Sequence, residues 1–226
     1  VEMKKKNSGY QITANVVMML VAVMVVLPFL LLFLSSITDE STLLKNGYSF
    51  FPEKFSLGAY EYIFRSGEKI FRAYGMTILV TVIGTVVNVA LSALFSYPLS
   101  LKNLPGRRVI TFFVFFTMLF NGGLVPTYIM WTQTFHIKNT IFALLVPNLL
   151  MGAFYVIMMR TYFSSNIPDA VIEAARIDGA GEMRILLKIV LPMSLPIIAT
   201  LALLTGLGYW NDWLNGLYYI QNDSLY

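Results

Sequence analysis

Residues 16–34 read VVMMLVAVMVVLPFLLLFL, an apolar run of 19 residues without a charge. A helix that crosses the hydrocarbon core of a bilayer needs about 20 mostly apolar residues, so this run is long enough. Lys4, Lys5 and Lys6 precede it, as basic residues precede the apolar part of a secretory signal. Such an apolar part has only about 7–15 residues and is followed by a small-residue cleavage site, which this sequence lacks. We therefore predict a helix that stays in the membrane.

The composition of the whole chain agrees with a membrane protein. Of its 226 residues, 57% are hydrophobic and 12% are charged, whereas a soluble domain carries about a quarter charged residues. High hydrophobicity excludes a disordered chain, and the absence of cysteine excludes a disulfide scaffold. A soluble nucleic-acid-binding protein is disfavoured, because the net charge of +4 would have to lie in one patch.

Uncharged stretches locate the membrane spans. Five of them, 21 to 32 residues long, lie between successive charged residues, and lipid offers no hydrogen-bond partner to an open backbone, so each is predicted to be a helix. The predicted spans are 14–37, 75–101, 109–132, 140–162 and 191–214, with an outer loop at 38–74. We therefore expect an all-α integral membrane protein, a polytopic helical bundle formed by a single domain, residues 1–226. Residues 216–226 resemble a loop that leads into a further segment, so we expect a sixth span that this chain lacks.

The basic residues predict the orientation in the membrane. Cytoplasmic segments of membrane proteins are enriched in Lys and Arg near the span ends. With a cytoplasmic N-terminus, ten of the 16 basic residues face the cytoplasm and six face outward. Five of those six lie in the outer loop, where acidic residues balance them. This orientation makes residues 164–192 cytoplasmic.

The 164–192 loop reads SSNIPDAVIEAARIDGAGEMRILLKIVLP. Pro168 suits the first turn of a helix, and Gly179 suits the turn that ends it. A second helical run is expected from about Glu182, and Pro192 marks the start of the last span. Helical spacing predicts that one shallow face of the first helix carries Val171, Ala174, Ala175 and Asp178.

Seven positions of this loop form a longer pattern: Glu173-Ala174-Ala175, three residues, Gly179, nine residues, Ile189, one residue, Leu191-Pro192. The pattern resembles the cytoplasmic signature of ABC importer permeases. Three further motifs are similar to carbohydrate-uptake permeases: NGGLVPTY at 121–128, MRTYF at 159–163 and YWNDW at 209–213. The chain most resembles the six-span inner-membrane subunit of maltose-type importers, in the branch that takes up complex oligosaccharides.

The resemblance implies a function and a set of partners. The 164–192 loop would be a coupling helix seated in a groove of a separate ATP-binding subunit. The residues expected to make or support this contact are Glu173, Ala174, Ala175, Asp178, Gly179, Ile189, Leu191 and Pro192. The expected partners are a second permease subunit, two ATP-binding subunits, an extracytoplasmic solute-binding protein and a sugar or oligosaccharide substrate. The expected location is the bacterial cytoplasmic membrane.

The sequence predicts no chemistry in this chain. It has no Gly-x4-Gly-Lys-Ser/Thr phosphate loop, so ATP and Mg²⁺ are expected in the partner ATPase subunits. His136 is the only histidine and cysteine is absent, so we predict no His/Cys metal site and no catalytic residue.

Polar and aromatic residues near the outer ends of the third and fifth spans form the predicted substrate path: Asn121, Gly122, Gly123, Tyr128, Trp210, Asn211, Asp212, Trp213 and Asn215. Aromatic rings can stack on the C–H faces of sugars, and amides can bond their hydroxyls. The alternative is the belt of Trp and Tyr found at any membrane interface. Asn88 and Asn148, within the spans, are predicted to join helices by hydrogen bonds. Residues 57–64 are predicted to form a short amphipathic helix.

Two other functions stay open on the sequence alone. A membrane structural or assembly protein could dock a cytosolic partner through the same loop without moving solute. A membrane enzyme is the third alternative.

Overall fold

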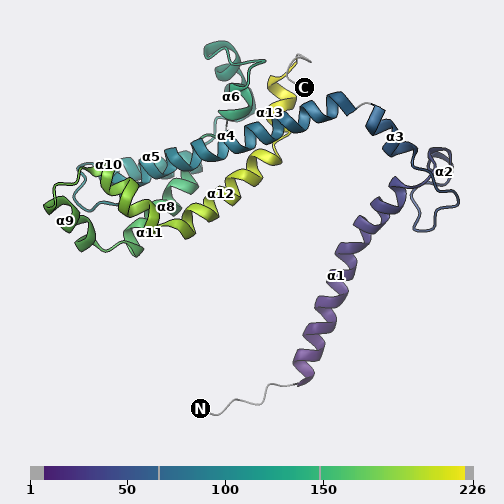
Figure 1. Cartoon of the computed structure of the whole chain (residues 1–226), viewed down its shortest axis with the longest axis horizontal. Helices are drawn as coiled ribbons and strands as arrows, with labels where there is room; N and C mark the ends of the chain where they lie inside the picture. Colours follow the sequence, from purple (N-terminus) through teal and green to yellow (C-terminus); the bar gives the residue numbers. More distant parts are fainter. Residues whose placement is uncertain (1–7, 66, 148, 222–226) are drawn as a thin grey trace. The chain divides into compact units, whose positions relative to one another are not determined.

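The computed structural model describes residues 8–65, 67–147 and 149–221, which are almost entirely helical (Figure 1). Within these ranges the only β-contact is an isolated antiparallel bridge between Thr38 and Phe55. The chain divides into two compact units, Val1–Ile70 and Phe71–Tyr226.

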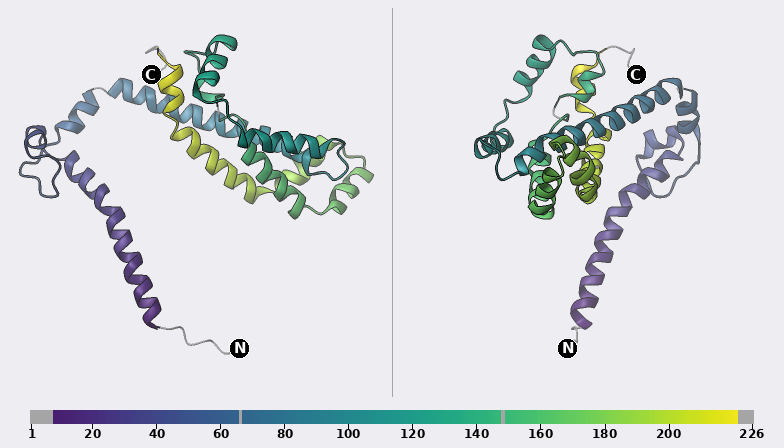
Figure 2. Two further views of the ribbon diagram at one scale, coloured as in Figure 1. Left: turned by 180° about the vertical axis from the view of Figure 1, so that it is seen from behind. Right: turned by 60° about the vertical axis from the view of Figure 1, so that its left-hand side comes forward.

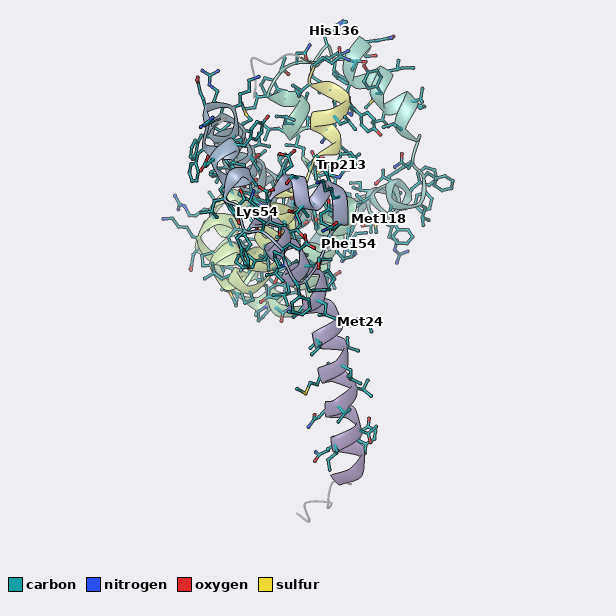
Figure 3. All side chains as sticks on the ribbon, turned by 90° about the vertical axis from the view of Figure 1, so that its right-hand side faces the viewer. Met24, Lys54, Met118, His136, Phe154 and Trp213 are labelled. Carbon is teal, nitrogen blue, oxygen red and sulfur yellow. The ribbon has the colours of Figure 1, made fainter. Side chains whose placement is uncertain are left out.

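The first unit contains α1 (Ser8–Ser36), α2 (Glu40–Asn46) and α3 (Gly58–Arg65). Helix α1 has 29 residues and is therefore about 44 Å long, more than the hydrocarbon core requires. Its side chains project freely on all sides, and Met24 is 71% exposed (Figure 3). Helix α3 confirms the short amphipathic helix predicted at 57–64.

The second unit begins within α4 (Gly67–Ser100), since the boundary between the units lies after Ile70. Its other helices are α5 (Arg107–Leu119), α6 (Leu124–Ile129), α7 (Phe142–Leu145), α8 (Ala153–Asn166), α9 (Asp169–Ile177), α10 (Glu182–Ile185), α11 (Leu191–Met193), α12 (Leu195–Trp210) and α13 (Leu214–Tyr219). Two π-helical segments, η1 (Met130–Thr134) and η2 (Leu186–Val190), complete it.

Helices α4, α8 and α12 run side by side through this unit (Figures 1 and 2). Both figures place α9 and α10 at one end of these helices and α6 and α13 at the other. The two regions that the sequence singled out as functional therefore lie at opposite ends of the same helical unit.

Side chains that bond to backbone carbonyls hold the unit together. The amide of Asn88 on α4 donates to the Leu149 carbonyl at 2.5 Å and accepts from the Thr205 hydroxyl of α12 at 3.4 Å. Ser96 donates to the Val156 carbonyl at 2.9 Å. These bonds satisfy polar groups that would be costly to leave unpaired in a membrane. They confirm the prediction for Asn88, whereas Asn148 lies outside the described residues.

The membrane spans are less regular than predicted. Among the described residues, α1 and α4 are long and apolar enough to cross a membrane, and two bent pairs bring the number to four if each pair is one span. Helix α5 meets residues 124–134 at 112°, and residues 182–193 meet α12 at 84°. The predicted span 140–162 is not one continuous helix, since α7 and α8 are separate and Pro147, which has no backbone N–H to donate, lies between them. The number of spans therefore remains a prediction.

Gly84 on α4 lies directly against the Tyr209 side chain of α12, and replacing it by alanine should destabilise the unit. A Cβ at this position would lie 2.3 Å from the Tyr209 ring, and that ring is held by a hydrogen bond of 2.8 Å to the Leu145 carbonyl. Overpacking of this kind costs about 1–3 kcal/mol, which unfolding in detergent would measure. Gly75→Ala on the same helix is the matched control, because no atom lies within 4 Å of its Cβ position. Equal changes in the two variants would contradict the prediction.

Candidate functional site

The 164–192 loop folds as a helix, a glycine turn and a second helix, as the sequence predicted. Helix α9 begins at Asp169, directly after Pro168. At its end the Ala180 N–H donates to the Ala175 carbonyl at 2.9 Å and the Gly179 N–H donates to the Arg176 carbonyl at 3.0 Å. This pair of bonds is the Schellman motif, and Gly179 occupies its left-handed position with φ +79°. Glycine adopts that conformation without the strain that a side chain would add.

Helix α9 has an inner and an outer face, and the division differs from the predicted one. Ile172 and Ala175 point inward and are 7% and 9% exposed. The outer face of α9 consists of Ala170, Glu173, Ala174 and Ile177, which are all exposed and follow i, i+3, i+4, i+7 spacing. The expected face of Val171, Ala174, Ala175 and Asp178 is therefore wrong, because Ala175 is buried while Ala174 and Asp178 are exposed.

The inner face of α9 belongs to the core of the second unit. Ile172 and Ala175 pack in one buried cluster that draws residues from α4, α8, α10, η2 and α12. Ile189 and Leu191 pack partly buried against this cluster, whereas Pro192 is exposed. The short side chain of Ala175 thus allows α9 to pack closely against the core of the second unit.

A polar network ties the loop to the end of α4. Glu182, at the start of α10, accepts hydrogen bonds from the Tyr97 hydroxyl at 2.5 Å and from the Arg176 Nε at 2.7 Å. The bond from Arg176, followed by that from Tyr97, lowers the pKa of the Glu182 carboxyl below its ordinary value of 4.5. One carboxylate therefore joins α4, α9 and α10.

A second set of contacts holds α8 against the end of α4 and α9 against the chain that follows α4. Lys102 and Asp169 form an ion pair at 2.5 Å, but both are largely exposed, so the pair adds little stability. Arg160, from the MRTYF motif, donates from Nε to the Leu99 carbonyl at 3.1 Å.

Because the polar network depends on the charged Glu182 carboxylate, the loop should become less stable in acid. Glu182 has a lowered pKa when folded, so its contribution is complete above the ordinary value of 4.5 and is lost as the pH falls through the folded value. We expect hydrogen exchange in residues 169–186, corrected for intrinsic rates, to lose protection below about pH 4.5. Glu182→Gln should weaken protection at neutral pH and remove this pH dependence.

Glu173→Gln is the matched control, since it removes a carboxylate from the exposed outer face of α9 and leaves the network intact. A loss of pH dependence in both variants would contradict the role assigned to Glu182.

At the other end of the unit, the structure brings parts of the predicted substrate path together. A cavity of about 220 Å³, here called the asparagine cavity, is lined by Asn121, Gly123, Leu124, Thr127, Leu214, Asn215, Tyr218 and Tyr219. The Asn121 side chain accepts from the Gly123 N–H at 2.8 Å, which shapes the break between α5 and α6. Asn215 is 5% exposed and donates to the Pro147 carbonyl at 3.0 Å, which uses one of the two hydrogens of its amide nitrogen.

The tryptophans line a separate cavity of about 490 Å³, here called the tryptophan cavity. Trp210, Asp212 and Trp213 contribute to its wall, together with Tyr209 and residues of α4 and α13. Asp212 accepts from the Asn215 N–H at 3.2 Å and thereby links the two cavities through one turn of chain. The two Trp side chains are 47% and 67% exposed.

Three residues of the predicted path line neither cavity. Gly122 is adjacent to the asparagine cavity in sequence, and Asn211 bonds back to the Leu207 carbonyl at 2.8 Å. Tyr128 stacks on Tyr219 with ring centroids 5.7 Å apart and packs against a buried cluster.

No group of three or more His, Asp or Glu side chains in the described part of the chain is placed to hold a metal ion. His136 lies exposed in the second unit (Figure 3).

These features define a helical membrane protein with an exposed helix, α9, at one end and polar, aromatic cavities at the other. The chain belongs to the family of binding-protein-dependent transport system inner membrane components, whose model matches residues 7–223. This membership confirms the resemblance to ABC importer permeases.

Relatives and a solved structure agree with the family. The chain is 37% identical over 219 residues to the polygalacturonan/rhamnogalacturonan transport system permease protein YtcP of Bacillus subtilis (strain 168), covering 97% of this chain and 75% of the relative. It is 36% identical over 204 residues to protein LplC of the same organism, covering 90% of this chain and 68% of the relative. The crystal structure of a bacterial ABC transporter involved in the import of the acidic polysaccharide alginate matches with a TM-score of 0.87 and 28% identity, covering 99% of this chain and 78% of that chain.

The family defines the role of the chain in general terms. It is a transmembrane permease subunit of an importer, located in the membrane, and the ATPase is a separate subunit. As an importer permease it acts together with a further permease, an ATPase and a solute-binding protein.

Proposed function

We propose that the chain forms part of the translocation path of an ATP-driven importer for carbohydrates, in particular oligosaccharides. The names of the relatives support this substrate class, since they include permease proteins of transport systems for polygalacturonan/rhamnogalacturonan and for arabinooligosaccharides. The asparagine and tryptophan cavities supply the amide and aromatic groups that bind sugar hydroxyls and stack on sugar rings. The predicted path residues outside these cavities, Gly122, Asn211 and Tyr128, would support their walls.

The observation that carries the coupling mechanism is the division of α9 into two faces. Its inner face shares one buried cluster with α4, α8 and α12, and its outer face is exposed. Interiors are closely packed, so a displacement of α9 would move these helices with it. We infer that the outer face of α9 docks on an ATP-binding subunit and that the 164–192 loop transmits movement of that subunit to the membrane helices.

The residues of the signature would then have different tasks. Glu173 and Ala174 would contact the ATPase, and the exposed Asp178 would lie at the edge of that contact. Ala175, Ile189 and Leu191 would hold the loop on its own core. Gly179 would shape the turn, and Pro192 would direct the chain toward α12.

The full assembly would contain a second, different permease subunit, two ATP-binding subunits that bind ATP and Mg²⁺, and an extracytoplasmic solute-binding protein. The N-terminus and the 164–192 loop would lie in the cytoplasm, as the basic residues predict. The asparagine and tryptophan cavities, at the opposite end of the helices, would then open toward the outside.

Reconstitution of the complex in proteoliposomes tests this function. We expect the sugar-loaded binding protein to stimulate ATP hydrolysis and to drive uptake of labelled oligosaccharide. ATPase subunits that bind the chain without any such stimulation would instead indicate a structural or assembly protein. Chemical turnover of a substrate by the purified chain alone would indicate a membrane enzyme.

A further inference from the structure

A cavity that the import mechanism does not use lies among the connection from α4 to α5, helix α5 itself and α8. Its volume is about 920 Å³, and its lining residues are Lys102, Leu104, Gly106, Arg107, Arg108, Thr111, Phe112, Phe115, Ile157 and Arg160. Four of these residues are basic, and none of the described lining residues is acidic. We call it the arginine cavity.

The polar groups of this cavity are only partly satisfied within the protein. Lys102 is paired with Asp169, and Arg160 uses Nε to bond the Leu99 carbonyl. The buried Nε of Arg107 and the buried hydroxyl of Thr111 find no hydrogen-bond partner among the described residues. Arg107 and Arg160 both line the cavity, which therefore brings together like charges that repel each other. An anion bound here would relieve that repulsion and supply acceptors for these donors.

The rest of the wall is apolar. Phe112 and Phe115 on α5 are 60% and 49% exposed, and no residue of α5 is buried as a whole. Arg107 starts α5, and the predicted span begins two residues later at 109. The cavity thus combines a basic end at the predicted membrane boundary with an aromatic surface that extends along the span.

Placing basic residues in cytoplasmic segments is enough to fix topology, but topology does not require four of them to line one cavity. The planar guanidinium group of arginine can donate two parallel hydrogen bonds to the oxygens of a phosphate. Basic pockets between membrane helices bind the headgroups of anionic lipids. We propose that the arginine cavity binds the phosphate group of an anionic phospholipid, whose acyl chain lies along Phe112 and Phe115. This proposal goes beyond sugar import and does not depend on the substrate that the chain carries.

Native mass spectrometry of the full chain in nanodiscs of phosphatidylglycerol and phosphatidylcholine tests the proposal. We expect wild type to retain phosphatidylglycerol in preference to phosphatidylcholine. Arg107→Gln with Arg108→Gln should lower that preference on the order of tenfold, because each basic residue adds to the attraction. Arg107→Lys with Arg108→Lys should keep most of it. Arg108→Gln alone, with a smaller expected loss, gives the same test if the double variant does not insert.

The matched control is Arg184→Gln with Lys188→Gln, which removes two exposed charges from the 164–192 loop, outside the cavity. It should retain the wild-type preference, and an equal loss in both double variants would overturn the site. Complete displacement of the lipid by inorganic phosphate would identify a site for the free anion. Release of the lipid when the second permease subunit is added would assign the cavity to a protein interface. Either result would overturn the proposal, as would the absence of any preference in wild type.

Discussion

Gly179→Val should leave the chain inserted in the membrane but reduce sugar-stimulated ATP hydrolysis and uptake by about tenfold or more. A β-branched residue at φ +79° strains the backbone, and forcing a side chain into this left-handed region costs about 1–2 kcal/mol. The turn would relieve that strain by breaking the two bonds of the Schellman motif, and α9 would lose its fixed orientation. About 1.4 kcal/mol corresponds to a factor of ten in an equilibrium constant. The strain is therefore large enough to reduce the coupling between ATP hydrolysis and uptake by about tenfold.

Two further variants separate backbone strain from contact with the partner. Gly47 also follows a helix, has φ +72° and has no atom within 4 Å of its Cβ position, but it lies in the predicted outer loop, so Gly47→Val should preserve coupling. Gly179→Asn adds a side chain that tolerates the left-handed conformation and should restore the turn. Since the space around Gly179 within this chain is open, a defect that persists in Gly179→Asn would come from the docked ATPase subunit. Normal stimulation and uptake in Gly179→Val would refute the coupling role of this turn.

The sequence predicted the helix, turn and second helix of the 164–192 loop well because the signals for them are local. Pro168, the acidic first turn and Gly179 act on their neighbours, so helix, turn and second helix follow from their order. The face of α9 that points outward was not predictable in the same way. Val171, Ala174 and Ala175 are all small or apolar, and only the position of the core shows that Ala175 is buried and Ala174 is exposed.

Contacts between residues far apart in the chain could not be predicted from the sequence. Tyr97 and Glu182 are 85 residues apart, and neither is conspicuous in its own segment. The arginine cavity likewise joins Lys102, Arg107 and Arg108 to Arg160, which the sequence assigned only to orientation and to a motif. Pro147 and Gly122-Gly123 mark the positions at which two of the predicted spans are broken. The length of an uncharged stretch does not show that a helix breaks within it, nor at what angle the two parts meet.

Ile177→Glu should weaken binding of the ATPase subunit about tenfold to a hundredfold. Ile177 is 86% exposed on the outer face of α9, outside the membrane spans that the sequence predicts. If the ATPase covers it, burial of the side chain contributes about 1.5–3 kcal/mol, and a carboxylate at this position would also have to lose its hydration. Binding of purified ATPase subunits to the chain in nanodiscs, titrated by fluorescence, would measure the change.

Leu44→Glu is the matched control for this variant. Leu44 is 81% exposed on the short helix α2, so the substitution makes the same chemical change in the predicted outer loop, away from the ATPase. The control should bind with wild-type affinity, and because both side chains are exposed, neither substitution should lower the stability of the isolated chain. Wild-type affinity in Ile177→Glu would show that the outer face of α9 remains uncovered in the complex, and the docking surface would then have to be sought on another part of the 164–192 loop.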